Sequence, residues 1–358
     1  MLIPAGKLWS LRRLSNRRGF FTMIAVDHRS CLERIVGDRR AQLPGDPRLA
    51  PTAWEDMGRI KRALIEEFFG PASALLLDPE CAYPLAIQSA DPAKGLLVAL
   101  EQATWEEASG GRKTLPYPGW SAETIRRIGA DGVKLSLWFR PEAAPGVLAH
   151  QRALVERVGR DCRQCDFAFV LEPLIYPLGG LQAGGTVSDA YLDAPGRRAE
   201  LVLAAVEEFQ QERYGVDIMQ VETPIAADAI TNPDDGSDAS RDAQALFDRI
   251  DRLLDRPWVM RSGGAAPEGF RRILTYAFRS GASGYLAGRS FWGPAVQEFP
   301  DWERLRWRVR QEGLSLVQTV GEALELYARP WIERPALAGG IEIEGAGPDF
   351  PIRYGSSR

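Results

Sequence analysis

The chain has 358 residues, of which 45% are hydrophobic and 26% are charged, and its formal net charge is −4 at pH 7. This size and composition suit one α/β barrel or two smaller domains, and the acidic charge argues against nucleic acid as a partner. No apolar run reaches the length of a membrane span or a signal peptide, so we expect a cytoplasmic protein. The four scattered cysteines and two histidines favour neither a disulfide framework nor a metal site, and we expect no cofactor.

Apolar runs that end on polar or glycine residues predict eight buried strands. In chain order these runs cover residues 20–27, 72–77, 95–100, 132–139, 166–171, 216–221, 258–261 and 283–286. Helical patterns lie before and between them, at about 8–14, 31–36, 52–69, 121–128, 147–159, 194–214, 242–254 and 267–279. The Gly and Pro content of residues 108–119 predicts a loop.

Eight strands alternating with helices predict a (β/α)8 TIM barrel. The barrel is expected at about residues 20–295, with a helical C-terminal extension at about 296–358, all in one domain. A doubly wound open sheet is the competing architecture, but no glycine-rich dinucleotide fingerprint follows the first strand. The extension has the pattern of a helix pair and an extended segment, which packs on the barrel or on another subunit.

Lys134 lies in the middle of a predicted buried strand, residues 132–139. The chain has only five lysines, at positions 7, 61, 94, 113 and 134, among 44 lysines and arginines, and only Lys134 interrupts an apolar run. A buried ammonium group needs carboxylate partners or loses its proton, and an uncharged amine is a nucleophile that forms Schiff bases. A structural ion pair is the competing explanation.

Polar residues end most of the predicted strands, and a barrel brings these ends together at one face. The acidic and amide residues at these ends are Asp27, Asp78, Glu80, Glu101, Glu172, Gln220 and Glu222. An amine among carboxylates suits carbinolamine and imine chemistry, because one carboxyl group protonates the leaving hydroxyl and another accepts a substrate proton. Structural ion pairs with the many arginines are the alternative.

The ends of the seventh and eighth strands predict an anion site. Ser262, Gly263 and Gly264 follow one strand, and Gly288 and Arg289 follow the other. Backbone N–H groups, a helix N-terminus and a guanidinium group at this place commonly hold a phosphate in barrels.

Together, these motifs resemble the class I aldolases that act on tagatose 1,6-bisphosphate and on 6-deoxy-6-sulfofructose 1-phosphate. The resemblance runs from about residue 15 to 295 and rests on residues 25–29, 75–80, 132–134, 171–173, 221–224, 262–264 and 287–292. It implies that Asp27 polarises the substrate, that Lys134 and Glu172 assist proton transfer, and that the glycine loops with Arg289 hold phosphate. We also expect His28, Arg29, Asp78 and Arg261 to bind the substrate or its phosphate.

Two positions depart from this family. The resemblance puts the Schiff-base lysine two residues before Glu222, where this chain has Gln220, and an amide nitrogen does not condense with a ketone. Arg261 stands where the relatives have an aliphatic residue, which suggests an additional anion such as a carboxylate or sulfonate, or a side chain that points outward and pairs with a helix.

Three hypotheses follow for the function. In the first, the chain is a carbon–carbon lyase acting on a phosphorylated or otherwise anionic ketose, with Lys134 as the amine, Glu172 and Asp27 as acid and base, and Gln220 and Glu222 in the same site. In the second, it is a sugar-phosphate isomerase or epimerase that forms no Schiff base. In the third, it is a regulator that binds a sugar phosphate. Association into a homo-oligomer is expected from the resemblance, and no membrane partner is.

Overall fold

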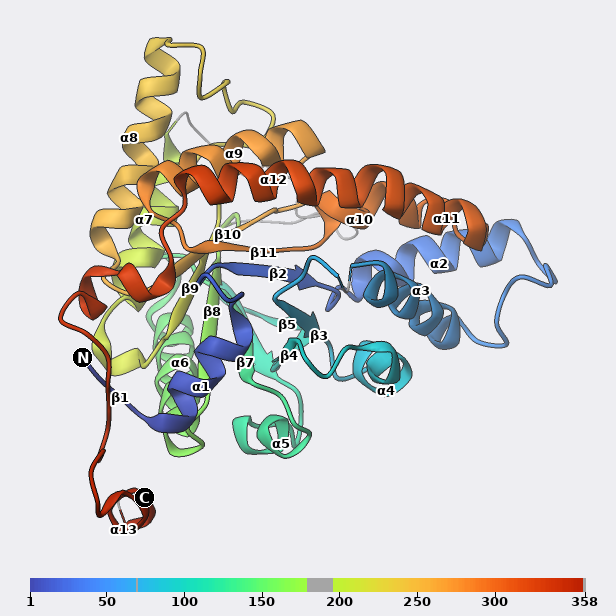
Figure 1. The fold of residues 1–358 in the computed structure, drawn as a ribbon. Helices are drawn as coiled ribbons and strands as arrows, with labels where there is room; N and C mark the ends of the chain where they lie inside the picture. Colours follow the sequence, from blue (N-terminus) through green and yellow to red (C-terminus); the bar gives the residue numbers. More distant parts are fainter. Residues whose placement is uncertain (69, 179–195, 357–358) are drawn as a thin grey trace.

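The computed structural model describes residues 1–68, 70–178 and 196–356, and its centre is a closed barrel of parallel strands (Figure 1). Each strand of the barrel pairs with the barrel strand that follows it along the chain, and the last pairs with the first. The barrel strands are β2 (Phe21–Ala25), β3 (Ala74–Leu77), β4 (Gly95–Ala99), β7 (Gly132–Trp138), β8 (Ala168–Leu174), β9 (Ile218–Val221), β10 (Trp258–Arg261) and β11 (Gly284–Ala287). All eight predicted strands and the TIM-barrel prediction are confirmed.

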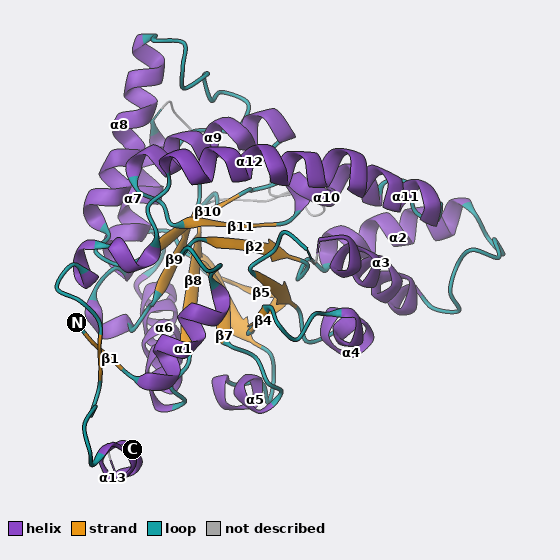
Figure 2. Cartoon of the chain, viewed as in Figure 1, coloured by secondary structure: helices purple, strands orange, loops and turns teal. Residues whose placement is uncertain are grey.

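Helices surround the strands, as Figure 2 shows. Those from the amino terminus to the middle of the chain are α1 (Ala5–Leu14), α2 (Ser30–Gln42), α3 (Ala53–Phe68), α4 (Ala82–Ala86), α5 (Ala122–Arg127) and α6 (Pro145–Gln164). The remaining ones are α7 (Arg197–Phe209), α8 (Asp238–Leu253), α9 (Pro267–Ser280), α10 (Arg289–Val296), α11 (Trp302–Arg308), α12 (Leu314–Tyr327) and α13 (Phe350–Ser356). Residues 194 and 195, the start of the helix predicted at 194–214, lie outside the described residues. No helix in the described ranges has the length and apolar character needed to cross a lipid bilayer.

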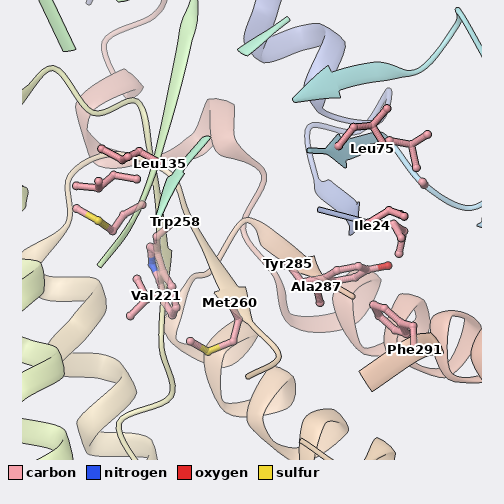
Figure 3. Close-up of a cluster of buried hydrophobic side chains, with 14 of the residues drawn as sticks. Ile24, Leu75, Leu135, Val221, Trp258, Met260, Tyr285, Ala287 and Phe291 are labelled. Carbon is pink, nitrogen blue, oxygen red and sulfur yellow. The ribbon is translucent and has the colours of Figure 1, made fainter. Parts of the chain in front are cut away.

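Alternation along the strands divides the core into two layers. Ile24, Leu75 and Leu135 point outward into the layer between barrel and helices (Figure 3). Met23, Leu76 and Val170 belong to the inner cluster. Leu11 and Leu14 of α1 join this cluster at the amino-terminal end of the barrel. The described residues therefore pack the barrel interior at its amino-terminal end, and a cavity lies toward the carboxyl ends of the strands.

A hairpin stands where the sequence pattern predicts a loop. Strands β5 (Glu101–Ala108) and β6 (Gly111–Pro116) pair antiparallel directly after β4. Trp105 packs edge-on against Trp138, with ring centroids 4.9 Å apart, and the Arg112 guanidinium lies 4.4 Å from the Trp105 ring. These tertiary contacts stabilise a polar segment that has little strand pattern of its own, and so the loop prediction at 108–119 is wrong.

The C-terminal extension packs on the chain's own barrel. Trp331 and Leu337 join the inner cluster, and the fully buried Arg334 pairs with Asp251 at the end of α8. Beyond them, β12 (Glu342–Ile343) pairs in parallel with β1 (Leu2–Ile3), and the chain then continues to α13 (Figure 1).

Candidate active site

Two small adjoining cavities lie at the carboxyl ends of the strands, each of about 150 Å³. The inner cavity is lined by Ala25, Asp27, His28, Leu76, Lys134, Ser136, Glu172, Leu174, Gln220, Arg261, Ser262, Gly263, Leu286, Ala287, Gly288 and Arg289. The hairpin cavity is lined by Asp27, His28, Arg29, Ser30, Glu101, Gln102, Ala103, Thr104, Thr114, Ser136, Trp138 and Leu174. The shared residues join them into one site, which contains most of the side chains predicted from sequence.

Lys134 points into the barrel from the middle of β7 and is surrounded by carboxylates. Its Nζ lies 2.5 Å from Glu172 Oε2, 3.6 Å from Asp27 Oδ2 and 3.8 Å from Glu101 Oε1. Nζ also donates to Ser136 Oγ, which in turn donates to Glu172 Oε2 at 2.9 Å. The side chain is only 4% exposed, so these contacts act with little screening by solvent.

The carboxylates decide the charge of this lysine. Burial lowers the pKa of Lys134, but the charges of Glu172, Glu101 and Asp27 outweigh burial, and the net pKa lies above the ordinary value. Burial raises the pKa of Glu172, but the charges of Lys134 and Arg261 outweigh burial, and the net pKa lies below the ordinary value. At rest the site therefore holds an ammonium–carboxylate pair rather than a neutral amine.

Arg261 lies at the end of β10 and binds two carboxylates. Its Nε forms an ion pair with Glu172 Oε1 at 2.8 Å, and its Nη1 donates to Glu222 Oε1. Glu222 also accepts a hydrogen bond from the backbone N–H of Ile175 at 2.9 Å and does not line the inner cavity. The alternative that Arg261 points outward to a helix is wrong, and Glu222 orients Arg261 instead of facing a substrate.

Gln220 comes from β9 and lines the same cavity as Lys134. Its Nε2 donates to the carbonyl oxygen of Leu286 at 2.8 Å, whereas its buried Oε1 has no hydrogen-bond partner in the part of the chain that the structure describes. An amide held in this way supplies a fixed acceptor for a ligand hydroxyl and no nucleophile.

Asp27 and His28 follow β2 and lie at the junction of the two cavities. Burial raises the pKa of Asp27, but the charge of Lys134 and other cations lowers it below its ordinary value. Burial lowers the pKa of His28 to about 3, against the opposing effect of Asp27, whose Oδ1 lies 3.4 Å from His28 Nδ1. Near neutral pH, Asp27 is thus a carboxylate and His28 a neutral ring.

The residues predicted to hold an anion lie together between β10 and α10. Gly263 and Gly264 have φ angles of 60° and 82°, which strain other residues, and a Cβ on Gly264 would lie 3.2 Å from Arg289 Cζ. Arg289 begins α10 and is the one cation of the two cavities for which the described residues supply no carboxylate within ion-pair distance. Its buried Nε has no hydrogen-bond partner there either. A guanidinium beside a glycine turn and a helix N-terminus suits an anion.

Two residues predicted to contact substrate are engaged elsewhere. Asp78 lies outside both cavities, because its carboxylate pairs with Lys61 of α3, and both side chains are fully buried. Asp78 also accepts the backbone N–H of Cys81 at 2.7 Å, which corrects its assignment to the substrate site. Arg29 does line the hairpin cavity, but its Nη1 donates to Glu80 Oε1 at 2.8 Å.

Sequence reasoning missed the residues of the hairpin cavity. Thr104, Thr114 and Trp138 reach the site only because the β5–β6 hairpin folds over the barrel mouth. The Thr and Trp residues spaced along 104–114 are the one sequence signal for it. Within the described ranges, no group of His, Cys, Asp and Glu is arranged to hold a metal ion. A larger groove of about 1690 Å³ lies at the amino-terminal end and contains none of the predicted site residues.

Comparisons with known proteins find similar aldolases. The model of the DeoC/LacD family of aldolases matches residues 21–293. Among curated proteins, tagatose 1,6-diphosphate aldolase 2 of Streptococcus agalactiae is 29% identical over 340 residues, covering 93% of this chain and all of that protein. Tagatose 1,6-diphosphate aldolase of Lactococcus lactis is also 29% identical over 340 residues, with the same coverage.

Solved structures show the same fold. Fructose-bisphosphate aldolase of Plasmodium falciparum aligns with a TM-score of 0.63 at 14% identity, covering 92% of this chain and 98% of that one. A Schiff-base-forming fructose-1,6-bisphosphate aldolase aligns with a TM-score of 0.52 at 16% identity, covering 86% and 99%. At these identities the likeness concerns the fold alone.

Proposed function

The chain belongs to the DeoC/LacD family of aldolases, and from this premise we propose that it is a lyase that cleaves a carbon–carbon bond of a phosphorylated ketose, with Lys134 as the reacting amine. The observation that carries the proposal is the position of the Lys134 ammonium group. It lies 2.5 Å from one carboxylate and within 4 Å of two others, beside a cavity that also holds Arg289, for which the described residues supply no carboxylate partner. The curated relatives, which are named for a phosphorylated ketohexose, support the substrate class.

The ion pair supplies the first proton transfer. When a proton passes from Lys134 Nζ to Glu172 Oε2, a neutral amine and a carboxylic acid result, with no change in net charge. Exclusion of water by the bound sugar favours this neutral form, because charges are costly in a low dielectric. The amine then adds to the ketone carbon, and a proton moves from nitrogen to the carbonyl oxygen to give a carbinolamine.

The two carboxyl groups complete the cleavage. Glu172 returns its proton to the carbinolamine hydroxyl, water leaves, and a protonated imine forms. Asp27 accepts the proton of the sugar hydroxyl next to the bond that breaks, the bond electrons move to the imine nitrogen as an enamine forms, and an aldehyde leaves. Asp27 then returns the proton to carbon, and water hydrolyses the imine, which frees Lys134 and the ketone fragment.

The direct test is an aldol assay with dihydroxyacetone phosphate and aldehyde acceptors. The active protein consumes dihydroxyacetone phosphate and forms a phosphorylated ketose, and Lys134→Met does not. Binding of dihydroxyacetone phosphate without any turnover would refute the lyase proposal and support a sugar-phosphate-binding regulator.

The raised pKa of Lys134 favours one second candidate. An ammonium group that keeps its proton polarises a carbonyl as an electrophile, while Glu172 or Asp27 moves a proton on carbon. This chemistry isomerises or epimerises a sugar phosphate without an imine. Exchange of substrate C–H protons with deuterated water, without release of an aldehyde, would identify it.

We also expect the protein to act in the cytoplasm on small molecules. Its net charge of −4 supports the absence of a nucleic-acid partner. Light scattering after size-exclusion chromatography tests the expected association of copies.

A further inference from the structure

The cations around the two cavities are few, and most of them are already neutralised. Among the residues described as lining the cavities they are Arg29, Lys134, Arg261 and Arg289. Lys134 and Arg261 share Glu172, and Arg261 also binds Glu222. Arg289, in the inner cavity, is therefore the cation that remains for a substrate anion.

Among the described residues that line the hairpin cavity, Arg29 is the only cation, and both of its Nη atoms already have partners. Its Nη1 donates to Glu80 Oε1 at 2.8 Å, and both Nη atoms donate to the carbonyl oxygen of Glu101 at 3.0 Å. The side chain is 5% exposed. To hold a phosphate, it would have to leave the Glu80 carboxylate, which is 27% exposed, and the buried carbonyl group of Glu101, which would lose a donor.

The rest of the hairpin cavity is neutral or acidic. Gln102, Thr104 and Thr114 supply amide and hydroxyl groups, and Trp138 supplies an aromatic surface. Asp27 and Glu101 supply negative charge at the same place. This lining suits a polyol, because hydroxyl groups accept and donate hydrogen bonds at little desolvation cost, whereas a second phosphate would be repelled.

The two cations of the hairpin strands, Arg112 and Lys113, are not among the residues that line the hairpin cavity, and Lys113 Nζ donates to Glu106 Oε1 at 2.8 Å. Arg112 of the hairpin lies behind Trp138, with its guanidinium 4.8 Å from that ring and its Nε 3.5 Å from Glu107. Residues 179–195 contain no Lys, Arg or His, and outside the described residues the only cation is Arg358 at the end of the chain.

We propose that the substrate carries one phosphate, bound by Arg289 and the Gly263–Gly264 turn, and that its other end is an uncharged polyol in the hairpin cavity. This inference rests on the proposed lyase function, and it separates the chain from relatives whose names specify a 1,6-diphosphate. In the aldol direction, the acceptor would be an uncharged aldehyde such as glyceraldehyde instead of glyceraldehyde 3-phosphate.

The test compares these two acceptors with dihydroxyacetone phosphate as the common donor. We expect kcat/KM for glyceraldehyde to exceed that for glyceraldehyde 3-phosphate by about tenfold or more, because the charged acceptor gains no cation. Preference for the phosphorylated acceptor would overturn the inference while leaving the lyase function intact.

If neither acceptor reacts, the lyase function fails, and equilibrium binding decides the inference. D-tagatose 1-phosphate and D-tagatose 1,6-bisphosphate are then compared by calorimetry. Tighter binding of the monophosphate supports the single-phosphate site, whereas tighter binding of the bisphosphate, equal binding or no binding of either sugar overturns it.

A gain-of-charge variant provides an independent test. Thr104 lines the hairpin cavity and is exposed, so Thr104→Lys adds a cation there without burying it. We expect this change to raise the preference for glyceraldehyde 3-phosphate over glyceraldehyde, or for the bisphosphate in binding, by about tenfold. Thr104→Gln, of similar length and without charge, is the matched control. An unchanged preference in Thr104→Lys would show that the far end of the substrate does not lie at the hairpin.

Discussion

Lys61 and Lys134 are both buried beside carboxylates, and their surroundings differ. Lys61 of α3 meets one carboxylate, Asp78, and both side chains are fully buried between helix and barrel wall. Asp78 is further fixed by the backbone N–H groups of Cys81 and Glu80, at 2.7 and 3.1 Å. Lys134 meets three carboxylates and faces a cavity of about 150 Å³.

The difference shows that burial and an ion pair do not by themselves mark a reactive lysine. The Lys61 pair is complete, because one charge neutralises the other and nothing can approach either group. Around Lys134 there are more acceptors than one ammonium needs, an open space, and an uncompensated guanidinium nearby. This combination offers a substrate an open space and a positive charge that can bind an anion. Four predictions follow from it.

The largest expected effect comes from removing the amine of Lys134. Lys134→Met should lower kcat/KM by about 10²–10⁴-fold or more, because a nucleophile and its coupled proton transfers are lost. Lys134→Arg keeps the charge but forms no imine, and so it should be equally inactive. Steady-state kinetics measure both variants, with circular dichroism as the control for folding. An arginine variant that retains more than about a tenth of the activity would favour imine-free catalysis.

Removing Lys61 should affect stability instead of chemistry. Lys61→Met leaves Asp78 charged and buried, which should lower the free energy of unfolding by about 3–5 kcal/mol. Urea denaturation measures this loss, and kcat of the folded enzyme should stay within about twofold of the parent. A second change, Asp78→Asn, should restore part of the stability, because an amide oxygen still accepts the Cys81 N–H. A large fall in kcat at unchanged stability would contradict the structural role of this pair.

Arg289 should contribute mainly to substrate binding. Arg289→Met should raise KM for a phosphorylated substrate by about 10–100-fold, equivalent to the roughly 1.5–3 kcal/mol of a hydrogen bond to a charged group. Inhibition by inorganic phosphate should weaken in parallel. Arg304→Met, on the exposed face of α11, is the matched control and should change neither value. An unchanged KM in the Arg289 variant would place the phosphate elsewhere.

Arg261 should have the smallest effect, seen in the pH dependence. Burial raises the pKa of Glu172, and Lys134 and Arg261 lower it, so Arg261→Met should raise this pKa. Glu172 must be ionised to accept the proton of Lys134, and the acidic limb of kcat/KM against pH should therefore move to higher pH.

The same change in the pKa of Glu172 should also alter how folding stability depends on pH. Because the folded-state pKa of Glu172 lies below its unfolded value of about 4.3, this group contributes stability above that pH and loses it as pH falls through the folded value. In Arg261→Met this contribution should be smaller. An acidic limb at the same pH as in the parent would show that Arg261 does not control the ionisation of Glu172.

The sequence predicts the barrel well because strands buried on both faces are continuous apolar runs, as in residues 132–139. The inward direction of Lys134 follows from the alternation along that strand. The positions of Asp78 and Glu222 do not follow, because their partners, Lys61 and Arg261, are distant in sequence. The hairpin is also missed, since packing of Trp105 on Trp138 determines it and local propensity does not.

Borohydride reduction in the presence of dihydroxyacetone phosphate, followed by peptide mass spectrometry, tests most directly whether Lys134 is the reacting amine. We expect a stable adduct on Lys134 and none on Lys61 or the other lysines. An enzyme that turns over a sugar phosphate without any adduct, or with an adduct on a different lysine, would contradict this role.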